Sequence, residues 1–451
     1  MSNQEATLEK AGYKQELKRE LGFWSLLLYG IAMMVPVAPI AVYGAVTGAS
    51  SGHMALAYLI AVIPMSFTAF SYGQMAGAFP VAGSAYTYTQ RAINPHIGFF
   101  AGWTILLDYA LFPIFNYIII AIYTTALFPM IPYWAVIIAG IAIVTLVNAL
   151  GIKSLSKINN FLVMFMFAVV AYFIIAAIIA LSKGTGSGFS SIALYNPKTF
   201  NFSALLLGTS IACFSFLGFD AMTTLAEEVK EPSKVLSKAT IVVCFLMGFL
   251  FILQAYLAQS VSPDFMAITD PNSAFYDICV KVGGQVLGTL TSIAMIVASL
   301  ANAIDSQAGV ARILYSMGRD EVIPKKVFAY LHPKTKVPVY SLFILAIIAV
   351  IGATQSLDTI LTMINFGALF AFMCVNISVI VHYYIKGKKR GAGGFIKFLL
   401  LPLLGFVTCF VLFISLSANA KIAGGIWLLI GIIYLASTTN FFRKTPKALD
   451  I

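Results

Sequence analysis

Three carboxylates lie inside long apolar stretches of the sequence, where an ionised side chain is costly to bury. Asp108 stands in the run from Trp103 to Tyr117, which contains no basic residue that could neutralise it. Asp220 and Asp305 occupy two further apolar runs. A carboxylate in such surroundings can accept hydrogen bonds from an ammonium group or carry a proton, and either chemistry requires a cavity that other elements enclose.

The composition places these apolar runs in a membrane. Of the 451 residues, 60% are hydrophobic and only 10% are charged, whereas a soluble domain is about 45–50% apolar and about 25% charged. These figures exclude a soluble globular protein and a disordered chain. The net charge of +11 comes from basic residues that flank the apolar runs, so no nucleic-acid partner is predicted.

About twelve apolar segments have a length close to the roughly 20 residues that a helix needs to cross a bilayer. They are residues 22–48, 54–78, 98–127, 132–150, 160–182, 203–226, 239–260, 286–311, 338–353, 359–384, 396–418 and 422–442. The loops between them are too short for a soluble domain. The sequence therefore predicts an all-α, multi-pass membrane protein whose surroundings are the lipid bilayer.

Basic residues predict the orientation of the chain. If the N-terminal segment 1–21 is cytoplasmic, all but four of the 28 Lys and Arg residues lie on the cytoplasmic side. The exceptions are Lys183, Lys198, Lys281 and Lys421. Because loops rich in Lys and Arg stay in the cytoplasm, we predict that segment 1–21 and the tail 443–451 are both cytoplasmic, and that the protein lies in a cell (plasma) membrane.

Two of the predicted spans are interrupted near their middle. Pro36 and Pro39 remove two backbone donors from the first span, and Gly218 and Asp220 interrupt the sixth. Non-helical backbone at this depth is tolerated where it lines a cavity, and paired breaks indicate a transport site between inverted repeats. The alternative is a simple kink in each packed helix. The predicted units are a first repeat of helices 1–5 at 22–182, a second, inverted repeat of helices 6–10 at 203–384, and helices 11–12 at 396–442.

Three motifs resemble the amino acid–polyamine–organocation superfamily of transporters. They are Phe214–Pro232 in helix 6, Phe79–Tyr88 after helix 2 and Arg312–Asp320 after helix 8. Within the superfamily, the chain resembles bacterial putrescine importers in Ala92–Phe99, Leu106–Tyr109, Cys213–Asp220 and Ile364–Ala368. The resemblance implies the five-plus-five inverted-repeat fold of the leucine-transporter type, with helices 1 and 6 broken. It also implies a secondary transporter of the bacterial inner membrane rather than an enzyme.

The break in helix 1 bears on the substrate. Amino-acid carriers of this superfamily hold the substrate carboxylate with free N–H groups of a glycine-containing turn at this break. Here the turn falls on Val35, Pro36 and Val37; proline donates no N–H, and the valines do not favour an open turn. We therefore predict that Pro36 and Val37 adjoin a substrate without a carboxylate, a diamine such as putrescine. The alternative is that proline forms a structural variant of the same turn.

A dicationic substrate requires carboxylates and aromatic faces. We predict that Asp108 binds one ammonium group, with Tyr109 as an aromatic wall or a hydroxyl acceptor. Related amino-acid carriers also place an acid and a tyrosine here, so the pair is not specific to polyamines. A hydrogen bond between packed helices is the alternative role for Asp108.

Similarity to arginine–agmatine exchangers implies roles around the helix-6 break. Asp220, two residues after the break glycine Gly218, is expected to bind an ammonium group or to exchange a proton. Phe214, four residues before Gly218, is expected to close over the substrate as a gate, and Phe216 adds a second aromatic face. Ordinary packing is the alternative for both phenylalanines.

Further charged residues are candidates for gating. Asp305 precedes Arg312 by about two helical turns, so both side chains lie on one face of helix 8. Asp305 is therefore a second ammonium site, a proton carrier or a partner for a neighbouring helix. Glu227 and Glu228, which occur widely in the superfamily, are expected to pair with Arg312 or Arg91 at an inner gate; substrate contact is the alternative.

The sequence leaves more than one coupling ion open. Some proton-coupled relatives carry a lysine in helix 5, but that position is Met166 here, and Phe161–Leu181 contains no lysine. We expect proton coupling through a carboxylate such as Asp220 or Asp305. Ser306 beside Asp305 would suit sodium instead, and exchange without any ion is a third alternative. No other cofactor and no obligate protein partner is predicted.

The leading interpretation is a polyamine importer that works by alternating access, putrescine being the first candidate substrate. A cationic or other amino-acid permease, or a polyamine/amino-acid exchanger, is the close alternative. An enzyme or a channel is remote, because no HExxH, GxSxG or P-loop pattern occurs and paired breaks suit alternating access better than an open pore.

The four histidines are scattered near span ends: His53, His96, His332 and His382. The five cysteines form no CxxC pair, which argues against a disulfide framework or a metal site.

Overall fold

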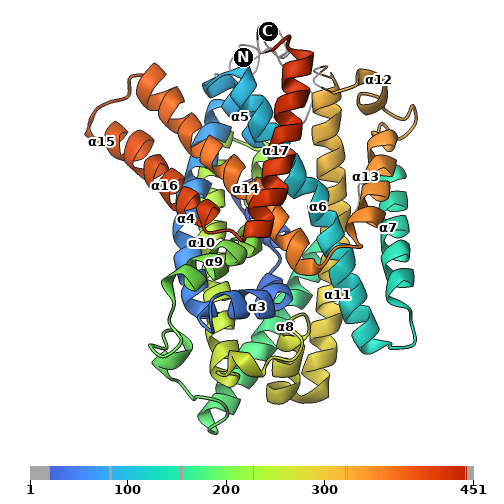
Figure 1. Cartoon of the computed structure of the whole chain (residues 1–451), viewed down its shortest axis with the longest axis vertical. Coiled ribbons are helices and arrows are strands. Elements are labelled where there is room, and N and C mark those ends of the chain that lie inside the picture. The colour runs from blue at the N-terminus through green and yellow to red at the C-terminus, as the bar shows by residue number, and fades with distance from the viewer. Residues whose placement is uncertain are drawn as a thin grey trace.

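The computed structural model describes residues 21–80, 84–151, 156–226, 228–319, 321, 323–441 and 443. These residues form a bundle of helices, and their one β-type pairing is an isolated bridge between Leu21 and Val229. Figure 1 shows α5 (Ser84–Ala92), α12 (Lys325–Phe328) and the end of α17 (Ala418–Thr438) at the same end of the bundle. We call this the α5 end.

The first half of the bundle contains α2 (Phe23–Met34), α3 (Ala38–Ala49), α4 (Met54–Ala78), α6 (Pro95–Leu127), α7 (Tyr133–Ala149) and α8 (Ser156–Ser182). The second half contains α9 (Phe202–Ala212), η2 (Cys213–Phe216), η3 (Ala221–Leu225), α10 (Pro232–Val261), α11 (Ala274–Arg319), α13 (Val339–Gly352) and α14 (Leu357–Val379). The π-helical turns η5 (Ile380–Lys386) and η6 (Ile396–Leu400) flank the short α15 (Ala392–Phe395), and α16 (Leu401–Ile414) precedes α17.

The helices account for the twelve predicted spans. Among the described residues, nine helical stretches are long and apolar enough to cross a membrane, and the bent pair α2–α3 forms a tenth span. The shorter apolar helices α7 and α13 supply the remaining two. The predicted span 286–311 is one part of the longer α11, which non-helical backbone at Gly284 divides (φ 68°, ψ −173°). The five-plus-five fold predicted from the sequence is confirmed.

The break in helix 1 lies where the sequence places it. The axes of α2 and α3 diverge by 45° across residues 35–37. Pro39 lies in the first turn of α3, where a backbone N–H would have no hydrogen-bond acceptor within the helix, so its absence costs no helical hydrogen bond. Val35 has a positive φ of 54°, a conformation that costs a β-branched residue of order 1–3 kcal/mol. The surrounding helices must hold this turn in place.

The break in helix 6 is fitted against the end of α2. After η2 the helix is interrupted by a turn at residues 217–220, in which Leu217 is extended and Gly218 has a φ of 115° that an L side chain rarely adopts. A Cβ atom at Gly218 would lie 2.7 Å from the carbonyl oxygen of Met33. Glycine is therefore required here both for its backbone conformation and for the close approach of the two broken helices.

Corresponding helices of the two halves pack on one another. Helix α4 lies against α10, α6 against α11 and α7 against α13, and Figure 1 shows each pair side by side. The same pairing holds at the breaks, where α3 contacts α9 and α2 contacts η3. These contacts bring both breaks to the centre of the bundle, beside α6 and α11.

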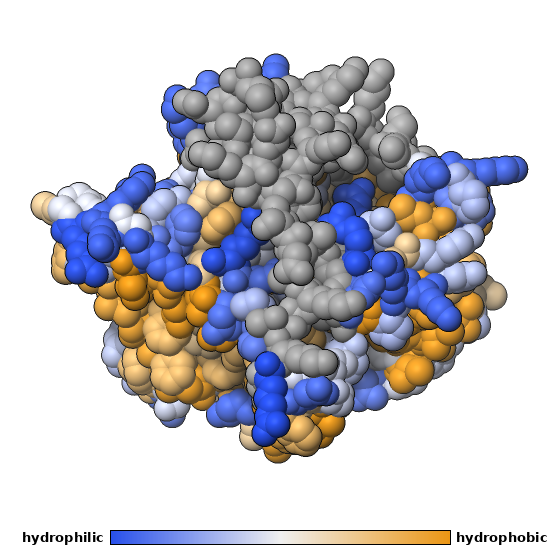
Figure 2. Space-filling view, turned by 90° about the horizontal axis from the view of Figure 1, so that it is seen from above, coloured by the Kyte–Doolittle hydropathy of each residue, from blue (hydrophilic) through white to orange (hydrophobic). Residues whose placement is uncertain are grey.

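The two appended helices lie outside this core. Helix α17 is fixed to α6 by Trp103 and Trp427, whose rings stack with centroids 4.6 Å apart. Each indole Nε1 donates a hydrogen bond of 2.8 Å to the carbonyl oxygen of the other residue. Figure 2, which views the α5 end, shows hydrophilic residues gathered on this end and hydrophobic residues around the flanks, the distribution expected of a protein embedded in a bilayer.

Candidate functional site

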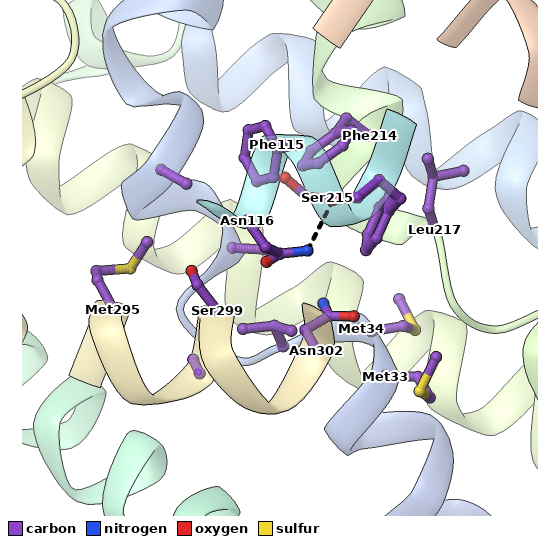
Figure 3. A pocket seen from close by; sticks show the side chains of 15 residues that line it. Met33, Met34, Phe115, Asn116, Phe214, Ser215, Leu217, Met295, Ser299 and Asn302 are labelled. Carbon is purple, nitrogen blue, oxygen red and sulfur yellow. Dashed lines mark hydrogen bonds between the residues drawn. The ribbon is translucent and has the colours of Figure 1, made fainter. Parts of the chain in front are cut away.

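A small cavity lies where the two broken helices meet α6 and α11 (Figure 3). Its volume of about 30 Å³ leaves room for about two water molecules. One wall is aromatic: the ring of Phe214 in η2 lies 4.4 Å from that of Phe115 and 5.3 Å from that of Phe112, measured between centroids. Met33 and Met34 of α2 lie on the opposite side.

Neutral polar side chains complete the lining. Asn116 of α6 donates a hydrogen bond of 2.9 Å to the carbonyl oxygen of Phe112. Ser299 and Asn302 of α11 project into the cavity from the other side (Figure 3). Asn302 is only 7% exposed, and its Oδ1 has no hydrogen-bond partner among the described residues. An unpartnered buried acceptor of this kind is suited to a ligand that donates hydrogen bonds.

The turn in helix 1 offers few donors to the cavity. The N–H of Val35 donates to Ile31 O at 3.1 Å, and that of Ala38 donates to Val35 O at 2.8 Å. Pro36 has no N–H. Within residues 35–37, only the N–H of Val37 is therefore free of a hydrogen bond to a described backbone group. The carbonyl oxygen of Pro36 instead accepts a hydrogen bond of 3.0 Å from Gln254 Nε2 of α10.

The structure brings together Asp220 and Tyr109, two of the residues that the sequence singles out. Tyr109 Oη donates a hydrogen bond of 2.8 Å to Asp220 Oδ2, and the backbone N–H of Gly218 donates to Asp220 Oδ1 at 3.2 Å. Asp220 is only 4% exposed. Both of its carboxylate oxygens therefore accept hydrogen bonds within the protein, and Asp220 does not line the cavity.

Asp108 and Phe216 lie away from the cavity, in contrast to the prediction. Asp108 is 5% exposed and faces α14, where a Cβ atom at Gly367 would lie 3.3 Å from the Asp108 Cβ. Successive residues of a helix point about 100° apart; Tyr109 donates to Asp220, whereas Asp108 is only within electrostatic range of Asp220. Phe216 is fully buried, and its ring centroid lies 5.4 Å from that of Phe251 in α10.

Three of the predicted gating residues, Asp305, Arg312 and Glu228, lie within electrostatic range of Tyr29 in α2, as does Asp220. Asp305 interacts with Arg312 on the same face of α11. Asp305 does not line the cavity, and Glu227 lies outside the described residues.

Sequence reasoning missed Asn116, Ser299 and Asn302. Asn116 follows Tyr109 by about two turns and so shares its face of α6, while Asn302 precedes Asp305 by about one turn of α11. Neutral polar residues at helical spacings from Tyr109 and Asp305 were the available signal. They also occur commonly between packed membrane helices, so the signal alone is weak.

Comparisons with known proteins agree with the broken-helix fold. Residues 25–423 match the amino acid permease family. The chain belongs to this family. The permease is 35% identical over 439 residues to the low-affinity putrescine importer PlaP of Escherichia coli K12, covering 97% of each chain. It is 25% identical to the branched-chain amino acid permease BcaP of Bacillus subtilis over 93% of each chain.

A third relative is named for the transport of cationic amino acids. The permease is 26% identical to the mouse cationic amino acid transporter 4, over 84% of this chain and 62% of that protein. The family and these relatives identify a multi-pass membrane transporter of the amino acid–polyamine–organocation superfamily rather than an enzyme. Of these three relatives, the putrescine importer PlaP shares the highest identity with the chain.

Proposed function

We propose that the permease imports putrescine or a closely related polyamine across the plasma membrane of a bacterial cell by alternating access, driven by protons. Both chain termini are cytoplasmic in this proposal, because the basic loops then lie on the inner side. The similarity to the putrescine importer PlaP supports the substrate class.

The observation that carries the substrate proposal is the donor-poor turn at residues 35–37. A half-helix terminus binds a carboxylate through several free N–H groups. Here the N–H groups of Val35 and Ala38 already donate to Ile31 O and Val35 O, and Pro36 has none. An α-amino acid would leave its carboxylate with Val37 as the single backbone partner, whereas a diamine makes no such demand.

The lining of the cavity suits an alkyl chain with an ammonium group at its end. The rings of Phe112, Phe115 and Phe214 offer faces that attract a cation and pack on methylene groups. Asn116 and Asn302 carry amide oxygens that can accept ammonium N–H groups. A cavity of about 30 Å³ is too small for a diamine, so the breaks must separate from α6 and α11 when substrate enters.

Asp220 is the proposed link between substrate and proton. Tyr109 and Gly218 donate to its two oxygens, and it follows the turn that carries Phe214. A change in the protonation of Asp220 would alter these hydrogen bonds and with them the helix-6 break. Asp305, which interacts electrostatically with Arg312, is the second candidate for the proton site.

The test is uptake of labelled putrescine into proteoliposomes that contain the purified permease. We expect saturable uptake that rises when the outside is made acidic, does not respond to a sodium gradient and resists excess arginine. Strong inhibition by arginine with little putrescine uptake would overturn the substrate proposal in favour of a cationic amino-acid permease. Uptake that follows the sodium gradient would overturn the proton proposal while leaving the diamine proposal intact.

A further inference from the structure

A dense group of cations occupies the hairpin between α14 and α16 at the α5 end. Lys388, Lys389 and Arg390 follow η5, and Lys397 lies in η6; all four are exposed. From residue 359 to residue 449 the sequence contains no Asp or Glu. None of these four side chains forms an ion pair with a carboxylate of the described residues.

Aromatic rings lie beside three of these cations, Lys389, Arg390 and Lys397. The rings of Tyr383 and Phe398 stack with centroids 4.5 Å apart and an angle of 16° between their planes. Lys389 Nζ lies 4.9 Å from the Tyr383 centroid and 5.5 Å from that of Phe398, and Lys397 Nζ lies 5.4 Å from the Phe398 centroid. Arg390 lies over Tyr384 at 5.7 Å. Two ammonium groups thus share one ring, which concentrates positive charge at one place.

Hydrogen bonds to other helices anchor the segment that carries the stacked rings of Tyr383 and Phe398. Tyr383 Oη donates a hydrogen bond of 3.1 Å to the carbonyl oxygen of Gln74 in α4. Lys386 Nζ donates one of 2.8 Å to the carbonyl oxygen of Ala92 in α5. The segment that carries the cations is therefore hydrogen-bonded to α4 and α5.

Large apolar side chains adjoin the cations and are themselves exposed. Ile385 and Ile396 are each 52% exposed, and Phe395 is 44% exposed. In Figure 1 the hairpin between α14 and α16 projects to the left. At the left edge of Figure 2, hydrophilic surface lies directly beside hydrophobic surface. Cations above exposed apolar groups match a molecule that has an anionic head and hydrocarbon tails.

We propose that Lys388, Lys389, Arg390 and Lys397 form a binding site for the phosphate headgroup of an anionic phospholipid, whose acyl chains lie along Ile396 and its apolar neighbours. Tyr383 and Phe398 position the ammonium groups on Lys389 and Lys397. A free phosphate ion would use the cations but leave the apolar surface uncovered, so the lipid is the better match.

The experiment is native mass spectrometry of the detergent-solubilised full chain, titrated with phosphatidylglycerol or phosphatidylcholine. The variant Lys389→Gln/Arg390→Gln/Lys397→Gln removes three cations of the site. The matched control Lys326→Gln/Lys334→Gln/Lys336→Gln removes three exposed cations from the loop around α12. We expect wild type and control to bind phosphatidylglycerol about tenfold more tightly than phosphatidylcholine, and the site variant to lose this preference.

Three results would overturn the proposal. The first is a wild type that shows no preference for phosphatidylglycerol. The second is an equal loss of this preference in both triple variants, which would indicate diffuse charge attraction. Competition by excess inorganic phosphate would indicate a site for the free ion. If the triple variant does not fold, the single variants Lys397→Gln and Lys397→Arg decide: the first must weaken phosphatidylglycerol binding and the second must retain it.

Discussion

Tyr109 and Asp220 belong to different repeats, and a hydrogen bond of 2.8 Å joins them. Tyr109 is fixed in the continuous helix α6, whereas Asp220 follows the turn that interrupts helix 6. The bond therefore ties the broken helix to an unbroken one at the point where the substrate proposal requires movement.

We expect Tyr109→Phe to lower the kcat/KM of putrescine uptake by about tenfold or more, because a hydrogen bond to a charged group contributes about 1.5–3 kcal/mol. Tyr117→Phe is the matched control: Tyr117 lies in the same helix, and its buried Oη has no partner among the described residues. Uptake assays on both variants check the prediction. Equal activity of Tyr109→Phe and wild type would contradict it.

Gln254→Met removes the donor to the Pro36 carbonyl oxygen and leaves that buried acceptor unpaired. The expected loss of stability is about 1–3 kcal/mol, and we expect uptake to fall as well because the turn in helix 1 loses its tie to α10. Gln259→Met is the control in the same helix, since Gln259 is also buried and donates at 3.3 Å to the carbonyl oxygen of Pro263, away from the break.

Thermal unfolding and uptake, measured on both glutamine variants, separate positioning from stability. Similar losses of stability in the two variants, with loss of uptake only in Gln254→Met, would support a positioning role for Gln254. If uptake falls in proportion to stability in both, Gln254 is a packing residue and nothing more.

Asn302→Leu removes the unpartnered amide oxygen from the cavity. We expect the KM for putrescine to rise about tenfold, since one hydrogen bond to an ammonium group is lost. Asn365→Leu is the control, because Asn365 of α14 is also buried and unpartnered among the described residues but does not line the cavity. A KM that changes equally in the two variants would remove Asn302 from the site.

Gly218→Ala should abolish most uptake and lower the unfolding temperature. Alanine would have to adopt a φ of 115° and place its Cβ 2.7 Å from Met33 O, so the two breaks could not approach each other. Gly425→Ala in α17 is the control, since a Cβ there meets no atom within 4 Å. Normal uptake by Gly218→Ala would show that the breaks function without this contact.

The sequence was sufficient to predict the spans and the breaks. Lengths of apolar chain are set by the thickness of the bilayer, and Pro36 and Gly218 change the backbone wherever they occur, so neither inference depends on distant contacts. The helical segment α5, by contrast, is too short and too polar to register as a span and was not predicted.

The wall of the cavity was harder to predict because it depends on rotation about each helix axis. Asp108 and Tyr109 are adjacent in the sequence, yet Tyr109 reaches Asp220 while Asp108 faces α14. The same holds in η2, where Phe214 lines the cavity and Phe216 packs on α10. Without the packing of α6 and α11, nothing distinguishes Asn302 from a polar residue that joins two helices.

The isolated bridge beside Leu21 runs through the main chain alone: Leu21 N donates to Glu228 O at 3.0 Å, and Lys230 N donates to Leu21 O at 2.9 Å. It links the start of α2 to the segment that leads into α10. No side-chain atom takes part, so among the natural amino acids only proline at position 21 or 230 would delete a donor. Mutations can therefore accumulate over generations in the side chains around this joint while the connection between the two repeats is inherited unchanged.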